Sequence, residues 1–137
     1  MRDAHSPLGI GVDAVTISEI ARLDREVDAF TERTFTERER AEADRRGAGR
    51  ASYLAGRFAS KEAVFKALAH LTPQGTFDLR IIETLAAPDG SPRVQMTPAL
   101  SRICEEAGVK GILLSITNEG DLAIAFAVTT GEPCLHS

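Results

Sequence analysis

The order of apolar and polar residues along the chain predicts a succession of strands and helices. Residues 8–15 (LGIGVDAV) alternate as a strand does, with large apolar side chains on one face and Gly9, Gly11 and Asp13 on the other. Residues 17–23 then place isoleucine and leucine at helical spacing. The chain therefore begins with a strand that leads into a helix.

Further helices and two hairpins follow. Thr36 and Glu39 form a capping-box signature, which predicts that a charged helix begins there. The longest helical pattern covers residues 51–70 and ends before the break LTPQG. The remaining segments are predicted as strands 78–86 and 91–96 about the turn PDG, a helix over 98–108, and strands 110–117 and 121–128 about the turn NEG. We expect an α+β fold, one domain over residues 1–137, with a largely antiparallel sheet packed with helices.

The composition is that of a water-soluble globular protein. The chain has 137 residues, of which 43% are hydrophobic and 26% charged. It contains no apolar run of the roughly 18 residues needed for a membrane helix, and Asp3 and Asp13 interrupt any signal-peptide pattern. Cys104 and Cys134 lack the spacing of metal or redox motifs and suit a reducing compartment. We expect a cytoplasmic protein that does not bind membranes.

The distribution of charge changes this description in one region. Nine basic and five acidic residues lie between Arg33 and Lys66, a local excess of positive charge in a chain whose net charge is −4. Such a region suits an anionic ligand or an acidic partner, although a salt-bridged helix surface would give the same pattern. Nucleic-acid binding is not expected, because the chain is acidic overall and has one tyrosine and no tryptophan for stacking on bases.

The longest predicted helix carries the candidate chemistry. Glu62 and Lys66 are four residues apart, and as a surface pair they would contribute only about 0.3–0.5 kcal/mol to stability. The helix is rich in alanine, however, and adds Arg57 and Lys61 around that one carboxylate. Asp13 lies on a glycine-lined strand face, which we expect to leave room for a ligand, and an acidic residue in such a position favours a cation.

Five segments, in order, resemble one enzyme family. They are GIGVDAV, FTERTFTERER, YLAGRFASKEAVFKAL, DGSPRV and LLSITNEGDLAIAFAV, and they are similar to segments of the holo-(acyl carrier protein) synthases, the small 4′-phosphopantetheinyl transferases of fatty acid and polyketide assembly. The resemblance covers Gly9 to about Thr130. It implies the fold of that family and the transfer of phosphopantetheine from coenzyme A to a serine of an apo carrier protein, with Mg²⁺ as cofactor and 3′,5′-ADP as product. It also implies a homotrimer with the sites between subunits.

The resemblance assigns roles to individual residues. Asp13 and Glu62 would hold Mg²⁺, as one or two carboxylates commonly do, and Glu62 would also accept the serine proton. Lys66 would stabilise the leaving 3′,5′-ADP, which makes Asp13, Glu62 and Lys66 the expected catalytic residues. The residues expected to hold the coenzyme are Arg57, Lys61, Lys66, Pro92 and Asn118.

Two positions depart from the family pattern. Asn118 stands where relatives have a histidine, and an amide cannot carry positive charge toward a phosphate. Glu19 stands where many relatives carry an arginine that meets the acidic carrier, so we expect Arg22 or the basic stretch 38–50 to compensate. A dedicated carrier, a member with another ligand and a non-catalytic binding protein are the alternatives that these departures leave open.

Overall fold

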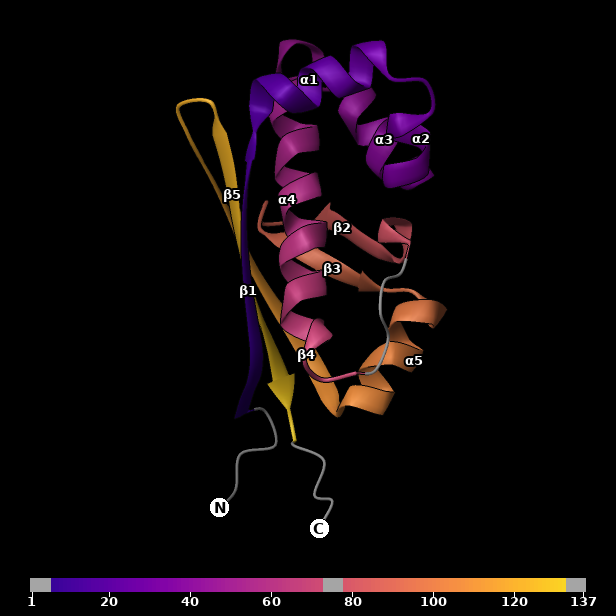
Figure 1. Ribbon diagram of the computed structural model, residues 1–137, viewed down its shortest axis with the longest axis vertical. Coiled ribbons are helices and arrows are strands. Elements are labelled where there is room, and N and C mark those ends of the chain that lie inside the picture. Colours follow the sequence, from indigo (N-terminus) through magenta and orange to yellow (C-terminus); the bar gives the residue numbers. More distant parts are fainter. Residues whose placement is uncertain (1–5, 73–77, 133–137) are drawn as a thin grey trace.

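The computed structural model describes residues 6–72 and 78–132, so Asp3, Cys134 and most of the predicted break at 71–75 lie outside it. The strands form a three-stranded antiparallel sheet of order β1-β5-β4 and a separate two-stranded antiparallel ribbon (Figure 1). The strands are β1 (Ser6–Thr16), β2 (Ile82–Ala86), β3 (Pro92–Met96), β4 (Val109–Glu119) and β5 (Leu122–Gly131). The helices are α1 (Ile17–Glu26), α2 (Phe30–Thr34), α3 (Glu37–Asp44), α4 (Arg50–Ala69) and α5 (Pro98–Ala107), with 3₁₀ turns η1 (Gly47–Gly49) and η2 (Leu79–Ile81).

Helix α4 is the centre of the arrangement. It lies between the three-stranded sheet and the β2–β3 ribbon, and it contacts β1, β5, β4 and β2 (Figure 1). Small residues on α4 allow this close packing, since Ala55, Ala59, Ala63 and Ala67 are all buried. Because α4 touches an element on nearly every side, its apolar residues follow no single stripe, and its charged residues must each find a partner or a ligand.

The glycines of β1 do not leave an open space for a ligand, as the sequence led us to expect. A Cβ atom added to Gly9 would lie 2.2 Å from the carbonyl oxygen of Ala67, and one added to Gly11 would lie 2.0 Å from that of Ala63. The glycines therefore permit the backbone of α4 to approach β1. The two glycines of the motif GIGVD do not contact a ligand themselves; they allow the strand to place Asp13 beside the helix.

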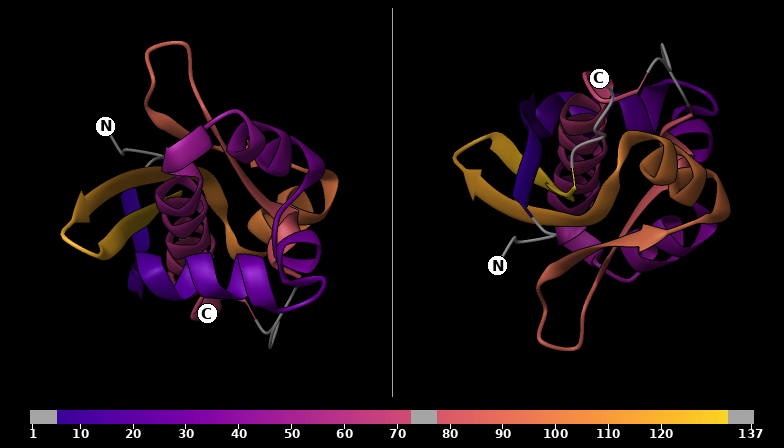
Figure 2. Two further views of the ribbon diagram at one scale, coloured as in Figure 1. Left: turned by 90° about the horizontal axis from the view of Figure 1, so that it is seen from above. Right: turned by 90° about the horizontal axis from the view of Figure 1, so that it is seen from below.

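The opposite face of the three-stranded sheet is apolar, and no helix of the described segments covers it (Figures 1 and 2). The register places Val12 beside Phe126, and Ile10 beside Val128 and then Leu113. The large exposed hydrophobic residues on this face are Ile10, Val12, Leu113, Leu122 and Phe126. A contiguous apolar surface of this kind is typical of an interaction site.

Most of the predicted elements are confirmed. Thr36 and Glu39 form the full capping box of α3, and both predicted hairpins have the expected pairing. Two local predictions differ: residues 79–81 form the turn η2 instead of the start of a strand, and helix α2 was not predicted. The α+β class with antiparallel sheets is confirmed. No helix in residues 6–72 or 78–132 is both long and apolar enough to cross a membrane.

Candidate active site

Asp13, Glu62 and Lys66 come together where β1 passes along α4. The Nζ atom of Lys66 lies 3.0 Å from Oδ1 of Asp13 and 3.0 Å from the carbonyl oxygen of Val12. The Asp13 side chain is mostly buried, whereas that of Lys66 is half exposed. The structure therefore brings together the three residues that were predicted to be catalytic, with the cation at the entrance of the cluster.

The carboxylates of this cluster interact with each other. Burial raises the pKa of Glu62, the negative charge of Asp13 raises it further, and Lys66 opposes both effects. Two carboxylates that repel each other in a partly buried site are stabilised by a bound cation. Mg²⁺ is commonly held by one or two carboxylates and completes its octahedron with water and phosphate oxygens. The pair fits such an ion, and the described residues contain no group of three or more potential metal ligands.

A groove of about 490 Å³ contains the second group of predicted residues. Arg57 comes from α4, Pro92 from β3 and Asn118 from the end of β4, and all three line this groove. Arg46 and Tyr53 line it as well, although sequence analysis did not single them out. The signal that could have found Tyr53 is its spacing, because it precedes Arg57 by four residues and so lies on the same face of the helix.

Two buried polar groups of residues that line this groove make no hydrogen bond with the described part of the chain. The Tyr53 ring lies between two guanidinium groups, with Cζ of Arg46 4.6 Å and Cζ of Arg57 4.5 Å from its centroid. Tyr53 and Arg57 are each only 8% exposed, yet the Tyr53 hydroxyl and Nε of Arg57 make no hydrogen bond with any described residue. An unpaired buried donor costs about 1–3 kcal/mol. Unpaired donors of this kind favour a ligand with oxygen acceptors, such as a phosphate.

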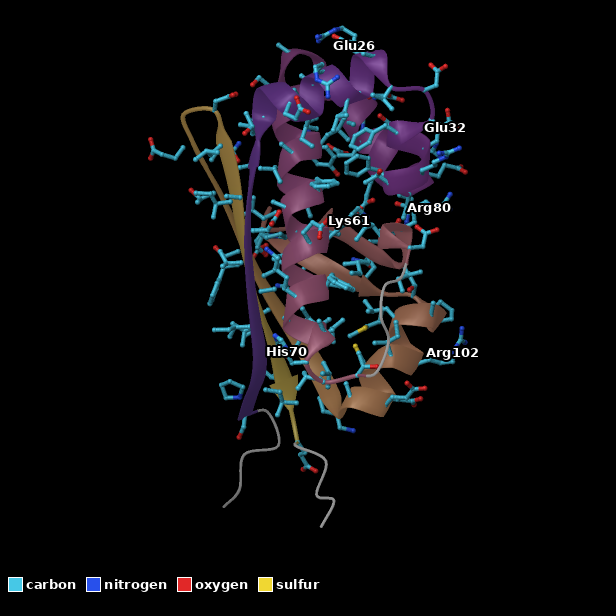
Figure 3. The ribbon with its side chains drawn as sticks, viewed as in Figure 1. Glu26, Glu32, Lys61, His70, Arg80 and Arg102 are labelled. Atoms are coloured by element: carbon cyan, nitrogen blue, oxygen red, sulfur yellow. The ribbon has the colours of Figure 1, made fainter. Side chains whose placement is uncertain are left out.

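Lys61, which was predicted to hold a phosphate, does not line this groove; its ammonium group is bound inside the fold. Lys61 extends from α4 (Figure 3) and is fully buried, and its ammonium group lies 2.7 Å from Oε1 of Glu39. It also donates to the carbonyl oxygens of Ile82 at 2.7 Å and Leu79 at 3.1 Å. These three partners use all three of its protons. Burial lowers the pKa of Lys61, while the charge of Glu39 opposes that effect.

The site residues lie on opposite faces of α4. With about 100° of rotation per residue, Glu62 and Lys66 are about 140° and 180° around the helix from Arg57. The sheet register agrees, since Asp13 on β1 and Ile116 on β4, a groove residue, flank Ala125 of β5. One copy of the chain therefore presents the carboxylate cluster on one side of α4 and the groove on the other.

The basic residues that were expected to compensate for Glu19 are mostly paired with acidic residues of the same chain. Arg22 donates to Glu19 from Nε at 2.9 Å and from Nη2 at 2.7 Å, so the two charges cancel on the surface of α1. The basic stretch is also largely paired: Arg38 binds Glu83, Arg45 and Arg46 bind Glu42, and Arg50 binds Asp24 and Asp44. For this stretch, a salt-bridged helix surface is the better description.

Comparison with known proteins identifies the class of protein. The model of the 4′-phosphopantetheinyl transferase superfamily matches residues 9–127, and the chain belongs to this family. Among curated proteins, it is 41% identical over 127 residues to a holo-[acyl-carrier-protein] synthase of Desulforudis audaxviator, covering 90% of this chain and 93% of that protein.

Solved structures of holo-(acyl carrier protein) synthases share the fold. The enzyme of Neisseria meningitidis is 36% identical with a TM-score of 0.77, covering 88% of this chain and 96% of the other. A coenzyme A complex of the enzyme from Chronobacterium ammoniagenes is 28% identical with a TM-score of 0.78, covering 90% and 97%. The resemblance found in the sequence is thus confirmed along nearly the whole chain.

Proposed function

We propose that this protein transfers 4′-phosphopantetheine from coenzyme A to a serine of an apo acyl carrier protein and releases 3′,5′-ADP. The observation that carries the proposal is the combination of a paired carboxylate cluster with a groove in which Nε of the buried Arg57 makes no hydrogen bond with a described residue. The relatives named holo-[acyl-carrier-protein] synthase and the coenzyme A complex of one of them support the same substrates.

The reaction follows from the chemistry of the residues. The serine hydroxyl oxygen forms a bond to the β-phosphorus of coenzyme A, and the bond from that phosphorus to the bridging oxygen breaks. Glu62, whose pKa is raised by burial, accepts the serine proton. The bridging oxygen leaves with the negative charge of 3′,5′-ADP, which the half-exposed Lys66 stabilises. Asp13 and Glu62 would hold Mg²⁺, which would supply charge neutralisation at the diphosphate.

The nucleotide end of coenzyme A is assigned to the groove. Arg57 offers a guanidinium with a free Nε–H, suited to a phosphate, and Asn118 adds an uncharged polar group at the exposed end of β4. Pro92 forms part of the wall beside the β2–β3 turn. Lys61 is left out of this assignment because its protons are already bound within the fold.

We further propose a homotrimer whose sites lie between subunits. The carboxylate cluster and the groove lie on opposite faces of α4, so a site that needs both is completed by another copy. The uncovered apolar face of the three-stranded sheet offers a surface on which copies can associate. Cys104, buried and without a disulfide, agrees with the cytoplasm as the place of the reaction.

The carrier reaction tests the proposed function. A panel of apo carrier proteins from fatty acid and polyketide assembly is incubated with the protein, coenzyme A and Mg²⁺, and the intact mass of each carrier is measured. We expect at least one carrier to gain the mass of one phosphopantetheine. A panel without any modified carrier would contradict the proposal, and calorimetry would then separate a coenzyme A-binding protein from a member with another ligand.

Subunit mixing tests the shared site. Glu62→Gln and Arg57→Ala variants, each inactive alone, are co-expressed with different tags and purified as a mixed oligomer. Activity should return in the mixture, because some sites then combine an intact Glu62 with an intact Arg57. Absence of recovery in a verified mixed oligomer would place both residues of a site in one chain.

A further inference from the structure

We propose that Lys61 is a positioning residue: together with Glu39 it fixes the β2–β3 ribbon against α4 and so sets the width of the coenzyme groove. This inference rests on the proposed function, because it concerns the same groove. It replaces the expectation of a direct phosphate contact with an indirect role, which is consistent with the complete burial of both side chains.

Most contacts of the pair lie at the base of the ribbon. Lys61 donates to the carbonyl oxygens of Leu79 in η2 and Ile82 in β2. Oε2 of Glu39 accepts from the backbone N–H of Thr84 in β2 at 2.8 Å. The other oxygen, Oε1, accepts from the backbone N–H of Thr36 at 2.9 Å, in the capping box of α3. One ion pair thereby joins α3, α4, η2 and β2.

Glu83, the residue between Ile82 and Thr84, is held by two further hydrogen bonds. The buried carboxylate of Glu83 accepts from Oγ1 of Thr36 at 2.5 Å and from Nη2 of Arg38 at 2.6 Å. Ile82, Glu83 and Thr84 are therefore each bound, in sequence, to α4 or α3. We call this set of contacts the ribbon clamp: Lys61, Glu39, Thr36 and Arg38 holding residues 82–84.

The far end of the same ribbon forms a wall of the groove. Ala86, Gly90 and Pro92 line it, and the turn projects away from the rest of the chain (Figure 2). Two strands alone are marginally stable in water, so the position of this end depends on how its base is held. Lys61 follows Arg57 by one helical turn on the same face of α4. The ribbon clamp is thus anchored on the helix one turn from the arginine on the opposite wall.

Stability alone does not explain why this position holds a buried ion pair and not two apolar residues. Apolar residues of similar volume are often as stabilising as such a pair or more so, because burying two charges carries a large desolvation cost. The pair provides directional hydrogen bonds, because Lys61 and Glu39 bind specific backbone atoms of Leu79, Ile82 and Thr84. Directed bonds fix the register and approach of a segment more narrowly than apolar contact does.

The test replaces both charges at once. The variant Glu39→Leu with Lys61→Met keeps an apolar pair of similar volume and leaves no buried charge unpaired, so it should be more stable than Lys61→Met alone, which leaves the Glu39 carboxylate buried without its cation. Both variants lose hydrogen bonds to the backbone of Leu79 and Ile82, so binding is measured on the folded fraction. For the folded double variant we expect the dissociation constant of coenzyme A by calorimetry and KM to rise about tenfold, with kcat changed less than about threefold. Amide hydrogen exchange should become faster in β2 and β3 and stay unchanged in α4.

A control and a second ligand make the interpretation specific. Thr129→Val removes a buried hydroxyl that contacts Gly9 and Ala67, away from the ribbon; it should lower stability without raising KM.

The effect of the double variant should be equally large with dephospho-coenzyme A, which lacks the 3′-phosphate. An effect that vanishes with this ligand would make Lys61 a phosphate ligand, and unchanged affinity or unchanged exchange in the ribbon would also overturn the proposal. Failure of the wild-type protein to bind coenzyme A would instead refute the proposed function, while the exchange measurement still tests the ribbon clamp.

Discussion

Replacing Gly11 by alanine tests how the strand β1 positions Asp13. The added Cβ would lie 2.0 Å from the carbonyl oxygen of Ala63, 2.8 Å from the backbone nitrogen of Ala67 and 2.9 Å from Cβ of Lys66. Since a Cβ atom essentially never approaches another heavy atom closer than 3.0 Å, strand and helix must separate by about 1 Å. Two of these three atoms belong to the helix backbone, so no side-chain rotation relieves the contact.

The expected cost follows from this geometry. Overpacking a core typically costs 1–3 kcal/mol, and a backbone contact belongs at the upper end, about 3 kcal/mol. For a chain of this size that corresponds to a fall in melting temperature of about 10 °C. The same displacement moves Asp13 away from Lys66, so the folded fraction should also lose transferase activity. Circular dichroism during heating and in urea measures the stability.

A second strand glycine provides the control. At Gly111 in β4 an added Cβ meets only the hydroxyl of Thr130, at 3.0 Å, and that side chain can move. Gly111→Ala should therefore change the free energy of unfolding by less than about 1 kcal/mol. If Gly11→Ala were as stable as this control, the proposed close approach of β1 and α4 would be refuted.

Three further predictions concern the surface and the departures from the family pattern. Glu19→Gln should lower KM for an acidic carrier by severalfold, because Arg22 loses its partner and regains a free charge; an unchanged KM in steady-state assays would show that α1 does not meet the carrier. Asn118→His should tighten coenzyme A binding in calorimetry by about three- to tenfold below pH 6, where the imidazole is charged, and less at pH 8; equal affinities would contradict this. Hydrogen bonding to Arg50 lowers the pKa of Asp24, so that carboxylate contributes stability above its unfolded pKa of about 3.9 and loses it as the pH falls through the lower folded value. Asp24→Asn should therefore cost about 1–2 kcal/mol in urea unfolding at pH 7 and much less at pH 3, and a constant difference would argue against this role.

The features that the sequence predicted well depend on neighbouring residues. The capping box at Thr36 and the turns of the two hairpins are local signals, and each formed as expected. The pairing of Asp13 with the face of α4 that carries Glu62 and Lys66 was also predictable, but only because the family resemblance linked two segments that are distant in the sequence.

The features that were missed depend on distant contacts. In the sequence, Lys61 cannot be distinguished from the other basic residues of α4. Its burial is decided by Glu39 and by two carbonyl oxygens about 20 residues further along the chain. Gly9 and Gly11 could equally have marked a ligand space or a helix contact, and only the position of α4 decides between them. The alternating pattern of β1 likewise could not show that no described helix covers the large apolar face of the sheet.

The central claim is transfer by the carboxylate cluster, and intact-mass measurement of an apo carrier tests it most directly. With coenzyme A and Mg²⁺, the wild-type protein should add one phosphopantetheine per carrier and release an equal amount of 3′,5′-ADP. Glu62→Gln, which removes the charge and keeps the shape, should leave the carrier mass unchanged. Transfer by Glu62→Gln at the wild-type rate, or no transfer by the wild-type protein to any carrier, would contradict the account.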